Sequence, residues 1–414
     1  MARHWGRASP LRCEHHSTSL LNILELYRHF ECTDPRDRIY ALLGLPSIDR
    51  NIPLPQPDYS KSVSEVYCET VKAIIQHTAD LSILCVPRDL RGVHSEHNLP
   101  SWVPNWTDKP SETAGLIQTG PPHLFRAECA FAAAKETFPK GPDFDFQREI
   151  TSFGFVPKKA RLIASSRRFW LKAGDGMGPS GLIERPIAPS CPPGSNHRLL
   201  ELSGYIVDEI RLISSPIPEE SFSGDGWKTH ILIWDRMVAR ILIILQHEGG
   251  DSDVAFDLLA SFLGVIMRGQ FHQTRGRELS DEHLTLSHIY HYLVWSGQIR
   301  RERAPCTIDE RTLGFIFDII LKESVRGRKF ALTNRGIPAL VPESASEGDK
   351  IAIVFGCDLP LVVRRLDTTT TPYDTESGRC WLLLGCTYVD GMMRGEGLEE
   401  AQERGLEEQR FLFF

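Results

Sequence analysis

The sequence lacks any apolar stretch long enough to cross a membrane. Its most apolar helical segment, 231–246, is interrupted by Asp235, Arg236 and Arg240, and it falls short of the roughly 18 to 20 apolar residues that a membrane-spanning helix needs. No apolar signal core follows Met1 either. We therefore expect a soluble, cytoplasmic protein with no membrane partner.

An excess of positive charge is also missing. Lys and Arg total 47 against 54 Asp and Glu, so the formal net charge at pH 7 is -7. A net-acidic chain has no general attraction for polyanions. We therefore expect no nucleic-acid partner.

Closely paired cysteines are absent as well. The 10 cysteines are scattered and form no Cys-x-x-Cys pair, which predicts reduced thiols. A length of 414 residues with 41% hydrophobic content excludes a small secreted disulfide scaffold and provides material for two or three domains.

The first eighty or so residues predict three helices. Asp34 and Pro35 begin a short second helix that Gly44 ends. Ser62 and Glu65 form a capping box for a longer third helix. The buried faces of the first and third are expected to hold Leu20, Ile23, Leu24 and Tyr27, and Val63, Val66, Tyr67, Thr70, Val71, Ile74 and Ile75.

Two prolines and two tryptophans follow in segment 99–106. The prolines favour a rigid extended loop, and we expect Trp102 and Trp106 to be buried. The alternative is an exposed recognition surface.

The remaining pattern predicts an α+β fold with a helical N-terminal region, an irregular middle, and C-terminal helices beside a small antiparallel sheet or barrel. The expected strands are 199–213, 329–333, 350–355, 359–366 and 380–389, and the expected helices are 228–247, 254–267, 283–295, one begun by the capping box Thr307/Glu310, and 398–410. The apolar end 411–414 is expected to dock onto the core.

Several segments together resemble fungal heterokaryon incompatibility (HET) domain proteins. They are 28–45 (RHFECTDPRDRIYALLGL), 57–63 (PDYSKSV) and 99–106 (LPSWVPNW), then 326–330 (RGRKF), 348–357 (GDKIAIVFGC) and 384–393 (LGCTYVDGMM). The motif positions, interpreted as structural, are Asp34, Pro35, Arg36, Asp37, Tyr40, Leu43, Gly44, Trp102, Pro104, Trp106, Gly348, Asp349, Gly356 and Gly391.

The resemblance implies a role in non-self recognition after hyphal fusion and in programmed cell death. It also implies a core similar to the Toll/interleukin-receptor fold, some members of which cleave NAD, but the N-terminal motifs of that core do not occur here. We therefore expect a truncated, non-catalytic protein with no cofactor and with protein partners. The alternatives are a fragment of an NAD-hydrolysing enzyme whose core lies upstream, and a degenerate scaffold without death activity.

The resemblance also suggests how the chain is divided. Residues 1–126 resemble the distal end of the HET segment, and 197–414 form a C-terminal domain of helices and a small sheet. The resemblance lapses over 127–196, which is either an insertion or linker or a translated intron.

Other patterns suggest chemistry, but each has a plainer explanation. The string from Gly176 to Gly181 matches G-x-G-x-x-G, but the prolines after it prevent the helix that a nucleotide site needs. The charges at 34–38 are explained by capping and local ion pairs rather than by acid–base catalysis. Metal ligation by His272, Glu282, His283, His288 and His291 is a further candidate, and histidines in a core or interface are the plainer explanation. Cys13, His15 and His16 could also bind a metal but lie near a terminus that is expected to fray, and the basic-aromatic segment 158–172 is also explained by a solvated loop.

Overall fold

The computed structural model describes residues 20–45, 53–78, 81–86, 97–107, 198–247, 261–266, 321–366 and 380–414, apart from residues 29, 323 and 394. Helices and an eight-stranded mixed sheet share this part of the chain, as expected for an α+β fold. The strands are β1 (Leu200–Ile213), β2 (Arg328–Thr333), β3 (Pro338–Pro342), β4 (Lys350–Val354), β5 (Leu361–Arg365), β6 (Cys380–Cys386), β7 (Tyr388–Val389) and β8 (Gln409–Phe413).

Part of the sheet closes on itself. Strand β1 pairs with both β4 and β8, β4 pairs with β5, β5 with β6, and β6 with β8, so these strands form a ring. The far end of β1 pairs with β2, which leads through β3 to β7. The β6–β8 pair is parallel. The sequence predicts a small antiparallel sheet or barrel; the structure has an eight-stranded mixed sheet in which every strand pair except β6–β8 is antiparallel.

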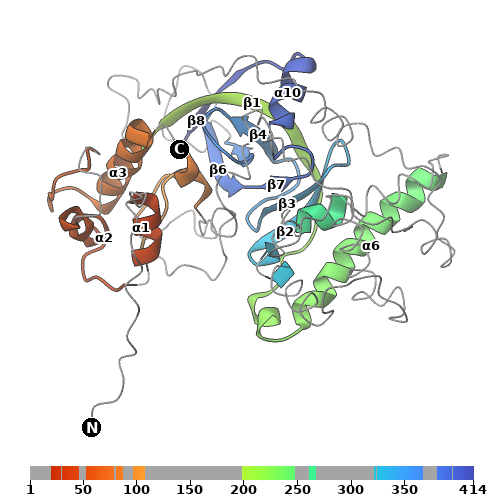
Figure 1. Ribbon diagram of the computed structural model, residues 1–414, viewed down its shortest axis with the longest axis horizontal. Coiled ribbons are helices and arrows are strands. Elements are labelled where there is room, and N and C mark those ends of the chain that lie inside the picture. Colours follow the sequence, from red (N-terminus) through yellow and green to blue (C-terminus); the bar gives the residue numbers. More distant parts are fainter. Residues whose placement is uncertain are drawn as a thin grey trace, which may run out of the picture.

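Helices lie around these strands (Figure 1). They are α1 (Leu20–Tyr27), α2 (Asp37–Tyr40), η1 (Ala41–Gly44), α3 (Val63–Thr78), η2 (Ser82–Cys85), η4 (Glu219–Ser223), α6 (Gly226–His247) and α10 (Glu396–Glu403). Figure 1 shows α1 to α3 on one side of the strands and α6 on the other. None of the described helices is long and apolar enough to cross a membrane.

The N-terminal helices follow local sequence signals closely. In the predicted capping box, the Ser62 amide donates to the Glu65 carboxylate at 2.8 Å and the Glu65 amide donates to Ser62 Oγ at 3.2 Å. Helix α3 buries the predicted side chains from Val66 to Ile75, with Val63 only partly buried. On α1 the predicted burial of Tyr27 is wrong, because 38% of this residue is exposed.

One hydrophobic cluster joins α3, η2 and segment 99–106, which we call the tryptophan loop, to the ring of strands. Trp102 and Trp106 are 0% and 1% exposed, which confirms their predicted burial. On the other side, α6 buries Trp227, Ile231 and Trp234 at helical spacing, and the Trp234 ring stacks 6.0 Å from Phe330 of β2.

The predicted helix 398–410 is wrong beyond Glu403. Helix α10 ends at Glu403, and Gly405 then has a φ of +63°, a value that favours glycine. Residues Gln409–Phe413 form β8 instead, because Phe411 and Phe413 alternate into the core. The expected docking of the apolar end is confirmed.

Most predicted C-terminal strands are present with ends shifted by one or two residues, and the last divides into β6 and β7. Strand β3 is missing from the prediction because prolines bound it at both ends. The predicted helix 254–267 is described only over 261–266, and the one begun at Thr307 only from 321 on, apart from residue 323. The predicted helix 283–295 lies outside the described residues. Segment 127–196 lies outside the described residues.

Candidate functional site

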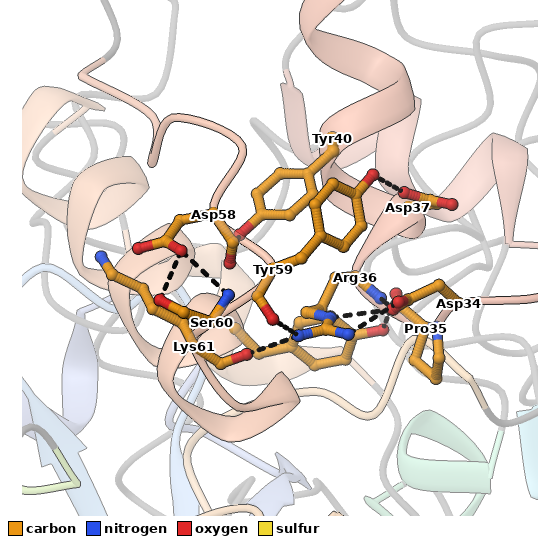
Figure 2. Close-up of polar contacts among 10 residues, drawn as sticks. Asp34, Pro35, Arg36, Asp37, Tyr40, Asp58, Tyr59, Ser60 and Lys61 are labelled. Carbon is orange, nitrogen blue, oxygen red and sulfur yellow. Dashed lines mark hydrogen bonds and ion pairs between the residues drawn. The ribbon is translucent and has the colours of Figure 1, made fainter.

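Arg36 lies at the centre of a polar cluster built from segments 34–40 and 58–61 (Figure 2). Its Nε and Nη2 donate to the two carboxylate oxygens of Asp34 at 2.9 and 2.7 Å. The Arg36 amide also donates to Asp34 Oδ1, at 3.0 Å. These hydrogen bonds lower the pKa of Asp34 and raise the pKa of Arg36, so both groups stay charged at neutral pH.

The third nitrogen of the same guanidinium fixes the second segment. Arg36 Nη1 donates to the carbonyl oxygens of Tyr59 and Lys61, each at 2.7 Å. The guanidinium carbon also lies 5.2 Å from the centroid of the Tyr59 ring, a cation–π distance. One arginine therefore ties the turn before α3 to the start of α2, using the fork geometry that lysine lacks.

Two tyrosines cover this clamp. The Tyr59 hydroxyl donates to Asp37 Oδ1 at 2.5 Å, which raises the pKa of Tyr59. The Tyr40 hydroxyl donates to the Asp58 carbonyl at 3.1 Å, and its ring meets the Tyr59 ring edge-on at 5.3 Å. Tyr40 is buried, whereas Tyr59 is 55% exposed. Tyr59 is thus held in place and still offers its ring to solvent.

The turn at Asp58 is stabilised by its own side chain. Asp58 Oδ1 accepts from the amide and the hydroxyl of Ser60, at 2.9 and 2.6 Å. These bonds lower the pKa of Asp58. Beside it, Lys61 Nζ donates to both carboxylate oxygens of Glu69 on α3, so the turn is fastened to the helix that comes after it.

Tyr67 of α3 brings the third motif segment to the first. Its hydroxyl donates to the Pro35 carbonyl at 2.7 Å, and its ring meets the Trp106 ring edge-on at 4.8 Å. Arg28 Nη2 donates to the Asn105 carbonyl at 2.9 Å. The segments 28–45, 57–63 and 99–106 therefore form one structural unit, which we call the motif unit.

The other N-terminal motif positions serve the same packing. Leu43 is partly buried against the core, Gly44 ends η1 on the surface, and Pro104 is buried. Trp102 donates from its indole nitrogen to the Arg198 carbonyl at 3.0 Å, just before β1. That bond links the motif unit to the ring of strands.

The C-terminal motif positions lie at turns between strands, and the structure does not bring them to Arg36. Gly348 and Gly391 have φ values of +88° and +68°. Asp349 accepts from the Ser346 amide at 2.7 Å and binds Arg364 through both carboxylate oxygens, at 2.7 and 2.8 Å. These contacts hold the turn before β4 against β5.

The carboxylate of Asp34 is committed to its ion pair with Arg36. Asp34 is held by Arg36, and its lowered pKa keeps it ionised, so it is poorly suited to exchange protons at neutral pH. The local ion pair predicted at 34–38 is confirmed. Within the described ranges, no group of three or more His, Cys, Asp or Glu side chains is arranged to hold a metal ion. The interpretation of the motif positions as structural stays a prediction.

The remaining sequence candidates lie outside the described residues. They are the glycine string 176–181, the basic-aromatic segment 158–172, and the candidate metal ligands Cys13, His15, His16, His272, Glu282, His283, His288 and His291.

Sequence reasoning missed a cluster of buried thiols. Cys85 of η2 lies with its Sγ 3.6 Å from Cys357 Sγ, and Cys386 Sγ donates to the Cys85 carbonyl at 3.5 Å. Hydrogen bonding with the Cys357 and Cys386 thiols, together with burial, raises the pKa of Cys85. Nothing local marks this cluster in the sequence, because Cys85 and Cys357 are 272 positions apart.

Comparison with known proteins gives a distant relative. The chain is 22% identical over 392 residues to heterokaryon incompatibility protein 6, OR allele, of Neurospora crassa. The alignment covers 89% of this chain and 50% of the relative, so the chain spans about half the length of the curated protein it matches. No family model and no solved structure matches the chain. The alignment supports a relationship to the fungal incompatibility proteins.

Proposed function

We propose that this chain acts in heterokaryon incompatibility, as a non-catalytic component of fungal non-self recognition that signals toward programmed cell death. The alignment with the Neurospora incompatibility protein over 89% of this chain carries the proposal. The motif unit supports it, because the three N-terminal segments that resemble the HET family pack together in one place.

The way the motif unit uses its polar groups favours a non-catalytic role. The Arg36 guanidinium is engaged by Asp34 and by two main-chain carbonyls. Tyr67 binds the Pro35 carbonyl, and Arg28 binds the Asn105 carbonyl. Side chains that bind main chain in this way fix the shape of a surface, which suits recognition of another protein.

The motif unit also exposes aromatic rings. Phe30 and Tyr59 are 65% and 55% exposed, and Phe30 lies 5.4 Å from the ring of Tyr27. The Tyr27–Phe30 pair and Tyr59 both lie beside α2. Arg38 of α2 donates to the Tyr27 carbonyl, and Asp37 of α2 accepts from the Tyr59 hydroxyl. Exposed aromatic side chains are enriched where proteins bind one another. We assign this aromatic edge, Tyr27, Phe30 and Tyr59, to contact with a protein partner.

Expression of the chain in a filamentous fungus tests the proposal. We expect growth arrest and uptake of a vital dye at high expression. We expect Phe30→Ala to lose that effect while it keeps its melting temperature, since Phe30 is 65% exposed. Leu212→Ala is the matched control, because Leu212 is an exposed apolar residue on β1, outside the motif unit. Normal growth with the unaltered chain would favour the degenerate scaffold instead.

A second assay addresses the enzyme alternative. Purified chain is incubated with NAD, and nicotinamide release is followed by chromatography. We expect no release above a buffer control. Turnover that scales with protein concentration would overturn the non-catalytic assignment.

A further inference from the structure

Three sulfur atoms meet where the N-terminal part of the chain touches the ring of strands. Cys85, Cys357 and Cys386 are 2%, 0% and 1% exposed. Cys85 belongs to η2, Cys357 comes after β4, and Cys386 ends β6, so each comes from a different element. Next to them the Leu81 amide donates to the Gly356 carbonyl at 3.0 Å, which holds the segment bearing Cys85 against the turn bearing Cys357.

The pair Cys85 and Cys357 is close enough to be joined. Their Sγ atoms are 3.6 Å apart, and a disulfide needs about 2.0 Å, so the sulfurs must approach by roughly 1.5 Å. Both residues lie in short non-strand segments, where a side-chain rotation and a small main-chain shift can supply that movement.

A buried cation accompanies the thiols. Arg328 of β2 is only 7% exposed, and its guanidinium contacts the Cys386 carbonyl and lies 3.7 Å from Cys386 Sγ. Among the residues that the structure describes, no carboxylate forms an ion pair with it. A buried guanidinium favours the thiolate form of the sulfur that it lies against, here Cys386, the neighbour of the Cys85–Cys357 pair. The 3.6 Å separation of the Cys85 and Cys357 sulfurs is the observation that points to thiol chemistry at this pair.

We propose that Cys85 and Cys357 form an oxidative modification site, at which a hydroperoxide converts the two thiols into a disulfide. One sulfur attacks a peroxide oxygen, the O–O bond breaks, and a sulfenic acid forms while an alcohol or water leaves. The second sulfur then displaces water from the sulfenic acid, and the S–S bond forms. The two thiols lose two electrons to the hydroperoxide, and their protons leave in the alcohol and the water.

The product has a clear structural consequence. The disulfide joins residues 272 positions apart, and it fastens η2 to the turn between β4 and β5. A link across so long a stretch of chain restricts the unfolded state strongly. The oxidised protein should melt about 5 °C or more above the reduced protein.

Oxidation of the full chain tests the proposal. Reduced protein is treated with hydrogen peroxide, free thiols are blocked with N-ethylmaleimide, and a non-reducing digest is examined by mass spectrometry. We expect a linked peptide pair that contains Cys85 and Cys357 and disappears on reduction. Cys357→Ala should abolish it, and Cys68→Ala should leave it unchanged, since Cys68 is also buried but lies on α3 away from the cluster.

Other outcomes overturn the proposal. One is the absence of any link when the exposed Cys32 is already fully oxidised in the same sample. Another is a link from Cys85 to Cys386 in place of Cys357. A third is a folded oxidised protein whose melting temperature equals that of the reduced form, because the two segments would then not be joined in the native structure.

Discussion

Ser101 binds Phe414, the last residue of the chain, through two hydrogen bonds that share one acceptor, the Phe414 main-chain oxygen. The Ser101 amide donates to the Phe414 main-chain oxygen at 3.0 Å, and the Ser101 hydroxyl donates to the same atom. Ser101 Oγ in turn accepts from the Leu383 amide of β6 at 3.0 Å. This one side chain therefore connects the tryptophan loop to β8 and β6.

Replacing Ser101 by alanine should destabilise the protein by about 1 to 3 kcal/mol, because the buried Leu383 amide loses its acceptor. Chemical denaturation measures the change. Ser346→Ala is the control, since Ser346 lies on an exposed turn. Equal stability of the two variants would mean that the Ser101 hydroxyl contributes nothing to the native state.

Trp102→Ala should destabilise the protein by about 3 to 5 kcal/mol. The ring is 0% exposed, and its indole nitrogen donates to the Arg198 carbonyl at 3.0 Å. Trp102→Phe separates the two contributions, because it keeps an aromatic ring and loses the donor. We expect an intermediate loss for Phe. A thermal shift near zero for the alanine variant would contradict the burial of Trp102.

Pro35→Leu should be mild, at about 1 kcal/mol or less. The contact that matters at this position is main-chain, since the Pro35 carbonyl accepts from the Tyr67 hydroxyl at 2.7 Å and leucine retains that carbonyl. Tyr67→Phe, which removes the donor, should be the more damaging change when both are compared by denaturant unfolding. The reverse order would show that the proline ring itself holds the motif unit together.

Features that depend on neighbours in the sequence were predictable, and long-range ones were not. The Ser62/Glu65 capping box is read within one helical turn, and so is the pairing of Asp34 with Arg36. The Arg36 bonds to the Tyr59 and Lys61 carbonyls span more than twenty positions and leave no trace in local pattern. Every residue has a main-chain carbonyl, so the residue types at the acceptor positions do not reveal these bonds. Such a clamp can be identified only from the folded structure.

The predicted helix 398–410 is also wrong because of long-range contacts. Segment 398–410 has the charge of an exposed helix, and local propensity favours that state as far as Glu403. Beyond Glu403 the conformation is decided by tertiary pairing, because Phe411 and Phe413 reach the core only if β8 lies between β1 and β6.

Gly204→Ala should prevent the ring of strands from closing properly, with a loss of about 3 kcal/mol or more. Gly204 is the residue of β1 that is paired with both Val354 of β4 and Gln409 of β8. A Cβ there would lie 2.1 Å from the Ile353 carbonyl oxygen, which is main chain and cannot rotate away. Gly44→Ala is the control, because a Cβ at that position meets nothing within 4 Å. Similar melting temperatures for both variants would rule out this close approach.

Asp390 should make the stability of the protein fall as pH rises from about 4 to about 6. Burial raises the pKa of Asp390 to about 6 from 3.8, even though Ser261 Oγ donates to its carboxylate at 2.6 Å. The folded state therefore binds the proton more tightly than the unfolded state does. The stabilisation is fully present below about pH 4 and is lost as the pH rises through 6.

The test compares melting temperatures of the unaltered protein and Asp390→Asn from pH 4 to pH 7, so that other titrating groups cancel in the difference. Asparagine can still accept the Ser261 hydrogen bond and carries no charge at any pH. The melting temperature of Asp390→Asn should therefore rise relative to that of the unaltered protein as the pH rises. Asp225→Asn is the control for the substitution itself, since the Asp225 side chain is 83% exposed. A difference that stays constant across the range would mean that Asp390 ionises in the folded protein as readily as it does in water.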